Sequence, residues 1–365
     1  MNAKVKAPPP HLMTLLHNTQ AFGEEKAFLQ ICKHIFTFRN YLRKFALTEP
    51  ELHTVRSALG SFFFITMSKP AYTIQEQIEL LKSRGMLFRD ESTAPHFLQN
   101  ISYYRLKGYW WDMQADRITH QLQPQTYFED IVDRYNFDRH LRLILFDAVE
   151  RIEVALRTQM IYHLSLGKGP CWYQDPNIVT DQVKQAKNLS KLMDEFGYSQ
   201  EIFIKDHKRR HPENHPESWK ILEIASFGTL SKFYKNLKHD LPEKSAIAKG
   251  MGLNLHVELS SWLEAIGYVR NIIAHHSRLW SRDMVKRPRV NLKNPTSLWL
   301  NLPLSEVQMK KPFLIISCML FLCNKVTPNH QIKMKILSLF EESPSMQIYK
   351  LGFLNNWENQ ELWKS

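Results

Sequence analysis

The sequence contains few cysteines and glycines: 4 and 12 among 365 residues. Cys32, Cys171, Cys318 and Cys323 form no Cys-x-x-Cys pair and no short Cys/His grouping of the zinc-binding kind. We therefore predict neither a disulfide framework nor a structural metal. Scarce glycine, with only 18 prolines, disfavours an all-β fold with its many turns and favours helices.

Long hydrophobic runs are also missing. The longest, Phe313 to Cys323, is too short to span a bilayer, and we interpret it as a buried helix. The first seven residues are followed by three prolines and by no hydrophobic signal core. We expect no membrane association and a cytoplasmic location.

Positive charge is in excess. Lysine and arginine number 48 against 36 acidic residues, which gives a formal net charge of +12. Such an excess attracts polyanions, with nucleic acid the first candidate and an anionic membrane surface the second. A basic protein without either partner remains an alternative. With 44% hydrophobic residues the chain can bury a substantial core.

Helical periodicity dominates the chain after its first 66 residues. Apolar residues at spacings of three and four predict a long helix from Phe128 to Leu166. Thr73, with Glu76 three residues later, predicts the start of a helix that stops at Gly85. We predict further helices over 94–100, 181–207, 219–237, 246–250, 257–278, 305–325 and 332–340. No strand-rich region is found, so the predicted fold class is all-α.

Composition and periodicity change along the chain and suggest a division into regions. Residues 1–66 show no clean period, and we interpret them as an N-terminal extension. The extension is either absent from the native protein, with translation starting at Met67, or poorly ordered. The remaining regions are a helical region rich in aromatic and basic residues, a helical domain and a C-terminal tail: 67–127, 128–345 and 346–365.

One short string within the helix predicted over 257–278 carries the chemistry. Arg270 and His275 place a permanent cation and a titratable base within about one and a half helical turns. Asn271 and His275 are four residues apart and share a helix face. Arg270 and His275 are about 140° apart around the axis, so a local distortion or a second copy of the helix would complete the site.

These two side chains suit the cleavage of RNA without a metal. The 2′-hydroxyl of RNA is an internal nucleophile, so the site needs a base, an acid and a group that stabilises the charged phosphorane. Histidine can move the proton, and arginine can hold the phosphate by two hydrogen bonds. His276 and Arg278 follow directly and are candidate supporting residues.

Other residues are candidates for a second half-site and for RNA binding. Arg157 and His163 form another Arg–His string on the long helix. The aromatic and basic residues of 101–111 could stack bases and contact phosphates, or simply pack against the main body. A basic run before Pro212 could bind phosphates or be a solvated helix end. The candidate RNA-binding residues are Tyr103, Tyr104, Arg105, Lys107, Lys208, Arg209 and Arg210.

Several sequence blocks follow one another in a characteristic order: 69–85, 101–109, 135–142, 150–158, 223–231, 270–280 and 351–357. They include Ser102-Tyr103-Tyr104-Arg105-Leu106-Lys107-Gly108-Tyr109 and His275-His276-Ser277-Arg278-Leu279-Trp280. On these blocks the chain from about Met67 onward resembles the abortive-infection Abi family of bacterial proteins, of the AbiD/AbiF type.

The resemblance implies an all-helical HEPN-like bundle with additional N-terminal helices. HEPN proteins typically cleave RNA with an Arg-x4-6-His motif, without a metal and commonly as dimers. By this resemblance Arg270 and His275 are catalytic, and Asn271 takes the polar position after the arginine. The implied function is that of an anti-phage toxin that cleaves RNA, restrained by a small regulatory RNA, active as a homodimer and free of cofactors. A non-catalytic RNA-binding module and a helical sensor of a phage protein remain alternatives.

Overall fold

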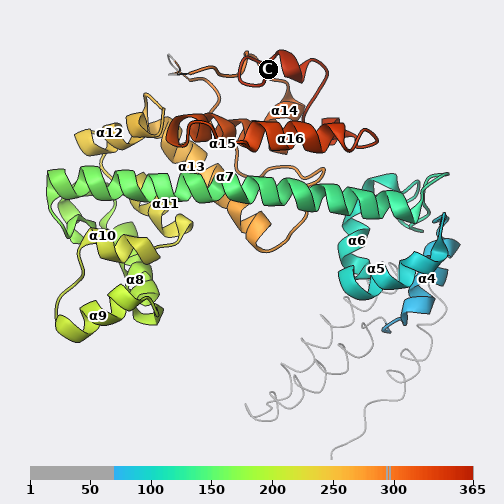
Figure 1. Ribbon diagram of the computed structural model, residues 1–365, viewed down its shortest axis with the longest axis horizontal. Helices are drawn as coiled ribbons and strands as arrows, with labels where there is room; N and C mark the ends of the chain where they lie inside the picture. Colours follow the sequence, from blue (N-terminus) through green and yellow to red (C-terminus); the bar gives the residue numbers. More distant parts are fainter. Residues whose placement is uncertain (1–69, 293–294, 296, 365) are drawn as a thin grey trace, which may run out of the picture. The chain divides into compact units, whose positions relative to one another are not determined.

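The computed structural model describes residues 70–292, 295 and 297–364. In these ranges the regular structure is helical, with isolated β-bridges and no strand, which confirms the all-α prediction (Figure 1). The chain divides into two compact units, and the second, Thr73–Ser365, contains every helix described below. The predictions for residues 1–66 lie outside the described residues.

Helix α7, Phe128–Lys168, is the long element around which the others are arranged. The apolar side chains on its inner face, such as Leu141, Leu145 and Leu156, are completely buried. Other helices pack against it, among them α6 (Tyr103–Trp110), α12 (Pro242–Gly250), α13 (His256–Ala274), α15 (Pro312–Val326) and α16 (Ile332–Glu341). Helices α15 and α16 lie along one side of it (Figure 1). The long helix predicted over 128–166 is confirmed.

Helix α15, Pro312–Val326, is buried on all sides from Pro312 to Cys323. The C-terminal segment covers it: the Trp363 indole N–H donates to Ser317 Oγ at 2.9 Å, and the Phe353 ring meets Phe313 edge to face at 5.0 Å. The prediction of a buried helix is confirmed. Within the described ranges no helix has the length and hydrophobicity needed to cross a bilayer.

Within the described residues, three short α-helices precede α7: α4 (Ile74–Ser83), α5 (Ala94–Ile101) and α6 (Tyr103–Trp110). The predicted start of α4 is confirmed, because Thr73 and Glu76 form a reciprocal capping box. Gly85 follows with φ of +86°, a conformation that glycine adopts without strain.

Three helices predicted as continuous are interrupted in the structure. The first pair is α8 (Gln182–Tyr198) and α9 (Ile202–Arg210), separated by extended backbone at Ser199. In the second, α10 (Ser218–Ile221) and α11 (Phe227–Asn236) are separated because Ser226 caps α11 by accepting from Thr229 N–H.

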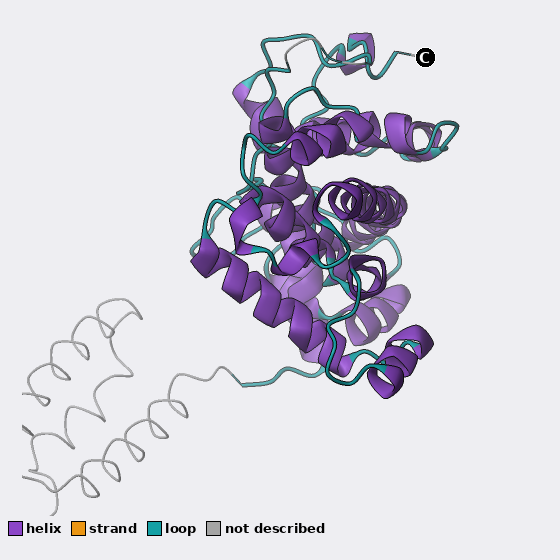
Figure 2. Cartoon of the chain, turned by 90° about the vertical axis from the view of Figure 1, so that its left-hand side faces the viewer, coloured by secondary structure: helices purple, strands orange, loops and turns teal. Residues whose placement is uncertain are grey.

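The third interruption separates α14 (Glu306–Lys310) from α15, because Pro312 lacks an N–H and restricts Lys311 to extended backbone. Helices α12 (Pro242–Gly250), α13 (His256–Ala274) and α16 (Ile332–Glu341) complete the fold. Figure 2 shows this succession of helices and connecting loops.

A buried lysine joins α12 to the end of α11 and gives a testable pH dependence. Lys244 is fully buried, and its ammonium group donates to the carbonyls of Leu237 at 2.6 Å and Lys235 at 3.3 Å. Burial lowers its pKa from 10.5 to about 8. The unfolded chain therefore binds this proton more tightly than the folded chain between these two values.

We expect the free energy of unfolding to rise as the pH increases from about 8 to 10.5, and this gain to be lost as the pH falls through 8. The variant Lys244→Met should lack this component. Urea unfolding of both proteins at pH 7.5 and pH 10 measures it. Equal changes between the two pH values in both proteins would contradict the assignment.

Candidate functional site

Helix α13 ends inside the Arg–His string. Its last residue is Ala274, and His276 adopts φ of +53°, in the left-handed region. His276 N–H donates to the Ile273 carbonyl and Ser277 N–H to the Ile272 carbonyl, each at 2.9 Å, which is the hydrogen-bond pattern of a Schellman motif. The predicted continuation of the helix to Arg278 is wrong. A local distortion, one of the two arrangements that the spacing of the string suggested, is present at this point.

The His turn, residues 275–277, presents side chains to solvent. Asn271 and His275 are exposed, and Arg270 is half-buried. Among the described residues no hydrogen bond or ion pair holds the Arg270 guanidinium, although its charge acts on Glu153 of α7. The packing of α13 on α7 therefore holds the backbone of Arg270 in place, and its guanidinium group can bind an anion.

Glu153 connects α7, α13 and the segment before α11. Its Oε1 accepts from Arg157 at 3.1 Å, and the same Arg157 nitrogen donates to the Ala225 carbonyl at 3.1 Å. Burial raises the pKa of Glu153, whereas the positive charges of Arg157 and Arg270 oppose that shift. This arrangement is a polar network around Glu153 and Arg157, and it lies beside the Arg–His string.

Asp138 anchors the segment that follows the His turn. Its carboxylate, completely buried on α7, accepts from Trp280 N–H at 2.7 Å, Leu279 N–H at 3.2 Å and the Tyr109 hydroxyl at 2.7 Å. Arg142 lies 3.4 Å away as a counter-charge. Burial raises the pKa of Asp138, and these donors and the Arg142 charge oppose the shift. Three elements far apart in the sequence thus meet at one carboxylate.

Helix α6 also holds the His turn. Arg105 donates to the His276 carbonyl at 2.5 Å. Arg278 donates to the Trp280 carbonyl at 2.8 Å and packs so closely on Gly108 that a Cβ there would lie 3.3 Å from its Cδ. Burial lowers the pKa of Arg278. Both arginines therefore bind backbone carbonyls, and Arg278 in particular is a partly buried structural group.

The other predicted RNA-binding residues of α6 differ in exposure. Tyr104 is 81% exposed, next to Arg105. Tyr103 is half-buried, and its hydroxyl accepts from Arg84 at 2.6 Å. Lys107 lies over the Trp111 ring, 5.6 Å from its centre. Of these residues, Tyr104 has the most exposed aromatic ring and is therefore the best placed to stack on a base.

The basic run at the end of α9 is largely engaged by its neighbours. Lys208 donates to the Gly197 carbonyl at 2.9 Å, at the end of α8. Arg209 and Arg210 both pair with Asp206, at 2.6 and 3.0 Å. These contacts fit the helix-end interpretation of the run more closely than a free phosphate-binding surface.

The structure does not bring the second Arg–His string together. Arg157 is held by Glu153 and the Ala225 carbonyl, whereas His163 lies 3.2 Å from Gln159. Gln159 in turn packs against Gly250 of α12. The two side chains therefore point to different neighbours around α7.

Asp138 and Tyr109 were not among the predicted site residues, although both belong to the sequence blocks noted above. A local signal did exist. Arg134, Asp138 and Arg142 recur every four residues within the apolar face of α7, and charged residues are rarely buried unless they are paired. That pattern indicates an internal ionic contact but does not identify its partners.

These contacts define an all-α protein in which distant sequence blocks converge on the C-terminal end of α13. The chain matches the family model described as Abi-like protein over residues 96–281, just over half of its length, and it belongs to that family. The matched region includes α6, α7, α13 and the His turn. No curated protein and no solved structure matches the chain. Membership of the family points to a role in abortive infection, a form of defence against phage.

Proposed function

We propose that this protein is a metal-independent RNA endonuclease with a HEPN-like domain, which acts as a toxin in phage defence and is restrained by an RNA partner. The observation that carries the proposal is the end of α13. There an arginine without a hydrogen-bonding partner among the described residues precedes an exposed histidine at a break in the helix. Family membership is compatible with nuclease activity.

His275 and Arg270 would divide the chemistry between them. His275 takes the proton from the 2′-hydroxyl, whose oxygen attacks the adjacent phosphorus, or returns a proton to the departing 5′-oxygen. The bond from phosphorus to the 5′-oxygen breaks, which leaves a 2′,3′-cyclic phosphate and a 5′-hydroxyl. Arg270 stabilises the negative charge of the phosphorane, and a preorganised contact of this kind contributes roughly 3–4 kcal/mol.

The neighbouring residues would position these two groups. The Asn271 carbonyl accepts from His275 N–H at 3.1 Å, so Asn271 and the histidine backbone are directly linked. His276 is exposed and lies next to the reacting phosphate in this proposal. Arg105 and Arg278 support the turn through the carbonyls of His276 and Trp280. Tyr104 and the net charge of +12 would favour binding of the RNA strand.

Cleavage in EDTA tests the proposal. We expect purified wild-type protein to cut RNA in EDTA, and Arg270→Ala to be about 100- to 1000-fold slower because the phosphorane loses its cationic partner. Arg117→Ala removes an exposed arginine outside the site and should cleave at the wild-type rate. In bacteria, expression of wild type should arrest growth and produce new RNA ends, whereas expression of Arg270→Ala should do neither.

Three outcomes would overturn the nuclease proposal. RNA binding without cleavage by either wild type or Arg270→Ala would identify a non-catalytic RNA-binding module. A sensor that acts by protein contact would be favoured if the purified protein binds no RNA and if wild type and Arg270→Ala arrest bacterial growth equally. New RNA ends that persist in Arg270→Ala would show that another nuclease makes the cuts.

A homodimer belongs to the same proposal. Leu143, Phe146 and Val154 form an apolar strip on one face of α7, exposed by 56%, 48% and 45%. Phe146 of the strip and Glu153 are seven residues apart on α7, about two helical turns, and therefore lie on the same face beside the proposed site. Pairing two copies through this strip would bury it and place the two Arg–His strings near each other.

Sedimentation velocity tests the homodimer. Wild type should sediment as a dimer, and Phe146→Asp as a monomer that keeps its helical circular dichroism. The control Val183→Asp changes an apolar side chain of α8 that is 67% exposed and should remain dimeric. A wild-type monomer at every concentration, or dimers of unchanged stability in Phe146→Asp, would remove the strip from the proposal.

A further inference from the structure

One partly exposed face of α13 leads to the His turn. Its residues lie within about 80° of one another around the helix axis, at 100° per residue: Ser261, Glu264, Tyr268, Asn271 and His275. His275 directly follows the last residue of α13, and its N–H donates to the Asn271 carbonyl at 3.1 Å, so it continues the helical register. This α13 face extends over roughly 21 Å from Ser261 to His275, at 1.5 Å per residue.

Two lysines border the α13 face near its middle. Glu264 accepts from Lys235 of α11 at 2.5 Å and from Lys286, which follows the His turn in the chain, at 2.6 Å. The two lysine side chains are 60% and 51% exposed. Their hydrogen bonds lower the pKa of Glu264, which therefore stays ionised at neutral pH. Two ammonium groups around one carboxylate leave a local excess of positive charge.

Arg287 and Arg289 extend this positive charge. Their segment is fixed on α13, because Arg289 N–H donates to Ser261 Oγ at 3.0 Å and the Trp262 indole N–H donates to the Arg289 carbonyl at 2.8 Å. Both arginines are exposed. Among the described residues, no hydrogen bond or ion pair holds either guanidinium group. The backbone is therefore held in place, while two cationic groups are available to an anion.

We propose that the α13 face and the cations beside it bind the single-stranded RNA that flanks the cleaved bond. These cations are Lys235, Lys286, Arg287 and Arg289. The inference rests on the proposed nuclease function and adds the position of the substrate strand. With the reacting phosphate at His275, the neighbouring phosphates of the same strand follow the face toward Ser261. Cations bind such phosphates without regard to base sequence, and the partly exposed Tyr268 ring can stack on a base.

The bound RNA is a single strand because of the chemistry of cleavage. The 2′-hydroxyl oxygen attacks the phosphorus in line with the departing 5′-oxygen, and a regular RNA helix does not hold these atoms in line. The α13 face is also continuous with Asn271 and His275 of the proposed site. This continuity favours the substrate strand over an unrelated anionic partner.

The salt dependence of RNA binding tests the proposal. Full-length protein with His275→Ala keeps the RNA intact, and fluorescence anisotropy of a labelled single-stranded RNA gives the affinity at several salt concentrations. Adding Arg287→Ala and Arg289→Ala, both exposed positions, should reduce the slope of log affinity against log salt by about 1.4, because each phosphate contact on a single strand contributes about 0.7. Adding Glu264→Gln should instead raise the affinity, because it removes the negative charge between the two lysines.

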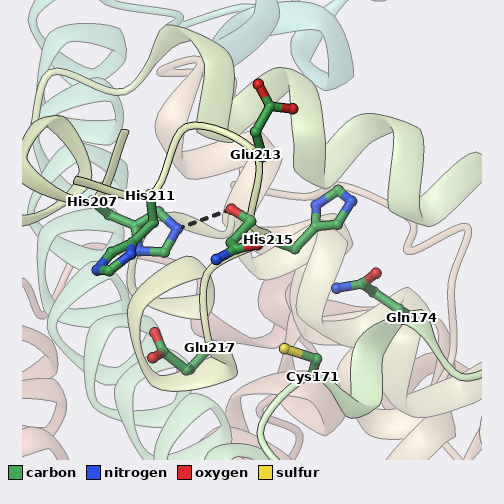
Figure 3. Close-up of a pocket in the computed structure, with 8 residues that line it drawn as sticks. Cys171, Gln174, His207, His211, Glu213, His215 and Glu217 are labelled. Atoms are coloured by element: carbon green, nitrogen blue, oxygen red, sulfur yellow. Dashed lines mark hydrogen bonds between the residues drawn. The ribbon is translucent and has the colours of Figure 1, made fainter. Parts of the chain in front are cut away.

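The matched control removes two arginines elsewhere. Arg209 and Arg210 are exposed on α9, between His207 and His211, which line a separate cavity of about 520 Å³ (Figure 3). Arg209→Ala with Arg210→Ala changes the net charge by the same amount and should leave the slope unchanged. Equal losses in the two arginine pairs would mean that RNA responds only to the net charge, and would overturn the proposal.

Cleavage kinetics distinguish the substrate from a regulatory RNA. With His275 intact and under single-turnover conditions, Arg287→Ala with Arg289→Ala should raise the protein concentration at half-maximal rate for a long RNA. The rate at saturation should stay near that of wild type. A dinucleotide has no flanking strand, so wild type and the variant should cut it equally. Weaker RNA binding without a change in half-saturation would assign the α13 face to a regulatory RNA and overturn the proposal.

Failure of the nuclease function would give a different result. Wild type that cuts no RNA would overturn the nuclease function and, with it, the role of the α13 face in substrate binding. Wild type that cuts RNA, with both arginine pairs indistinguishable in binding and cleavage, would overturn only the assignment of the α13 face.

Discussion

Replacing His275 by alanine should slow RNA cleavage by about a thousandfold, because general acid–base catalysis by a positioned histidine contributes on that order. RNA binding should change little, because the exposed imidazole is a single contact and the many lysines and arginines supply most of the attraction to RNA. Single-turnover cleavage rates at saturating protein, together with fluorescence anisotropy of a labelled RNA, measure both quantities. Loss of binding in parallel with cleavage would instead assign His275 to substrate recognition.

His276→Gly is the matched control for that experiment. His276 has φ of +53°, where glycine is unstrained, so the substitution removes a second imidazole and preserves the turn. We expect cleavage within about tenfold of wild type, in line with a supporting role next to a catalytic histidine. A loss as large as that of His275→Ala would make His276 a principal catalytic residue and would require the roles to be reassigned.

Replacing Asp138 by alanine should lower the free energy of unfolding by about 3–5 kcal/mol. The carboxylate accepts from Tyr109 and from two backbone N–H groups in a buried place, and its removal leaves these donors and Arg142 without their acceptor. Equilibrium urea unfolding measures the change. Cleavage should also fall, because the segment directly after the His turn loses its attachment to α7.

Asp133→Ala provides the comparison for Asp138. Asp133 lies on the same helix but is exposed, so its removal should alter stability by less than about 0.5 kcal/mol. A destabilisation of Asp138→Ala below about 1 kcal/mol would mean that the contacts around Trp280 contribute little. The segment after the His turn would then be held mainly by its apolar residues.

The long helices were predictable because their apolar pattern is local and repeated. The pattern from Phe128 to Leu166 leaves no competing period, and the apolar run of α15 is longer than a usual strand. The interruptions at Ser199 and Ser226 were not predicted. A single residue that ends a helix changes the periodic pattern very little, and Ser226 acts through the N–H of Thr229.

The candidate site also has a part that the sequence predicted and a part that it did not. Arg270 and His275 were found because the motif is a short string, whereas the end of α13 at Ala274 depends on a left-handed histidine that has no sequence signature. The contacts of Asp138 with Leu279 and Trp280 join residues far apart along the chain. The sequence contains both partners of such a contact, but only the packed fold brings them together.

The pairing of α7 with α15 has a consequence for synthesis on the ribosome. The apolar face of α7 is complete at Lys168, yet its partner begins only at Pro312. Because synthesis proceeds at about 5–20 residues per second, the apolar face of α7 remains without α15 for on the order of ten seconds. A nascent chain with so much uncovered apolar surface is a natural client for chaperones. The yield of active protein should therefore depend strongly on the speed of translation, even if the folded protein is stable.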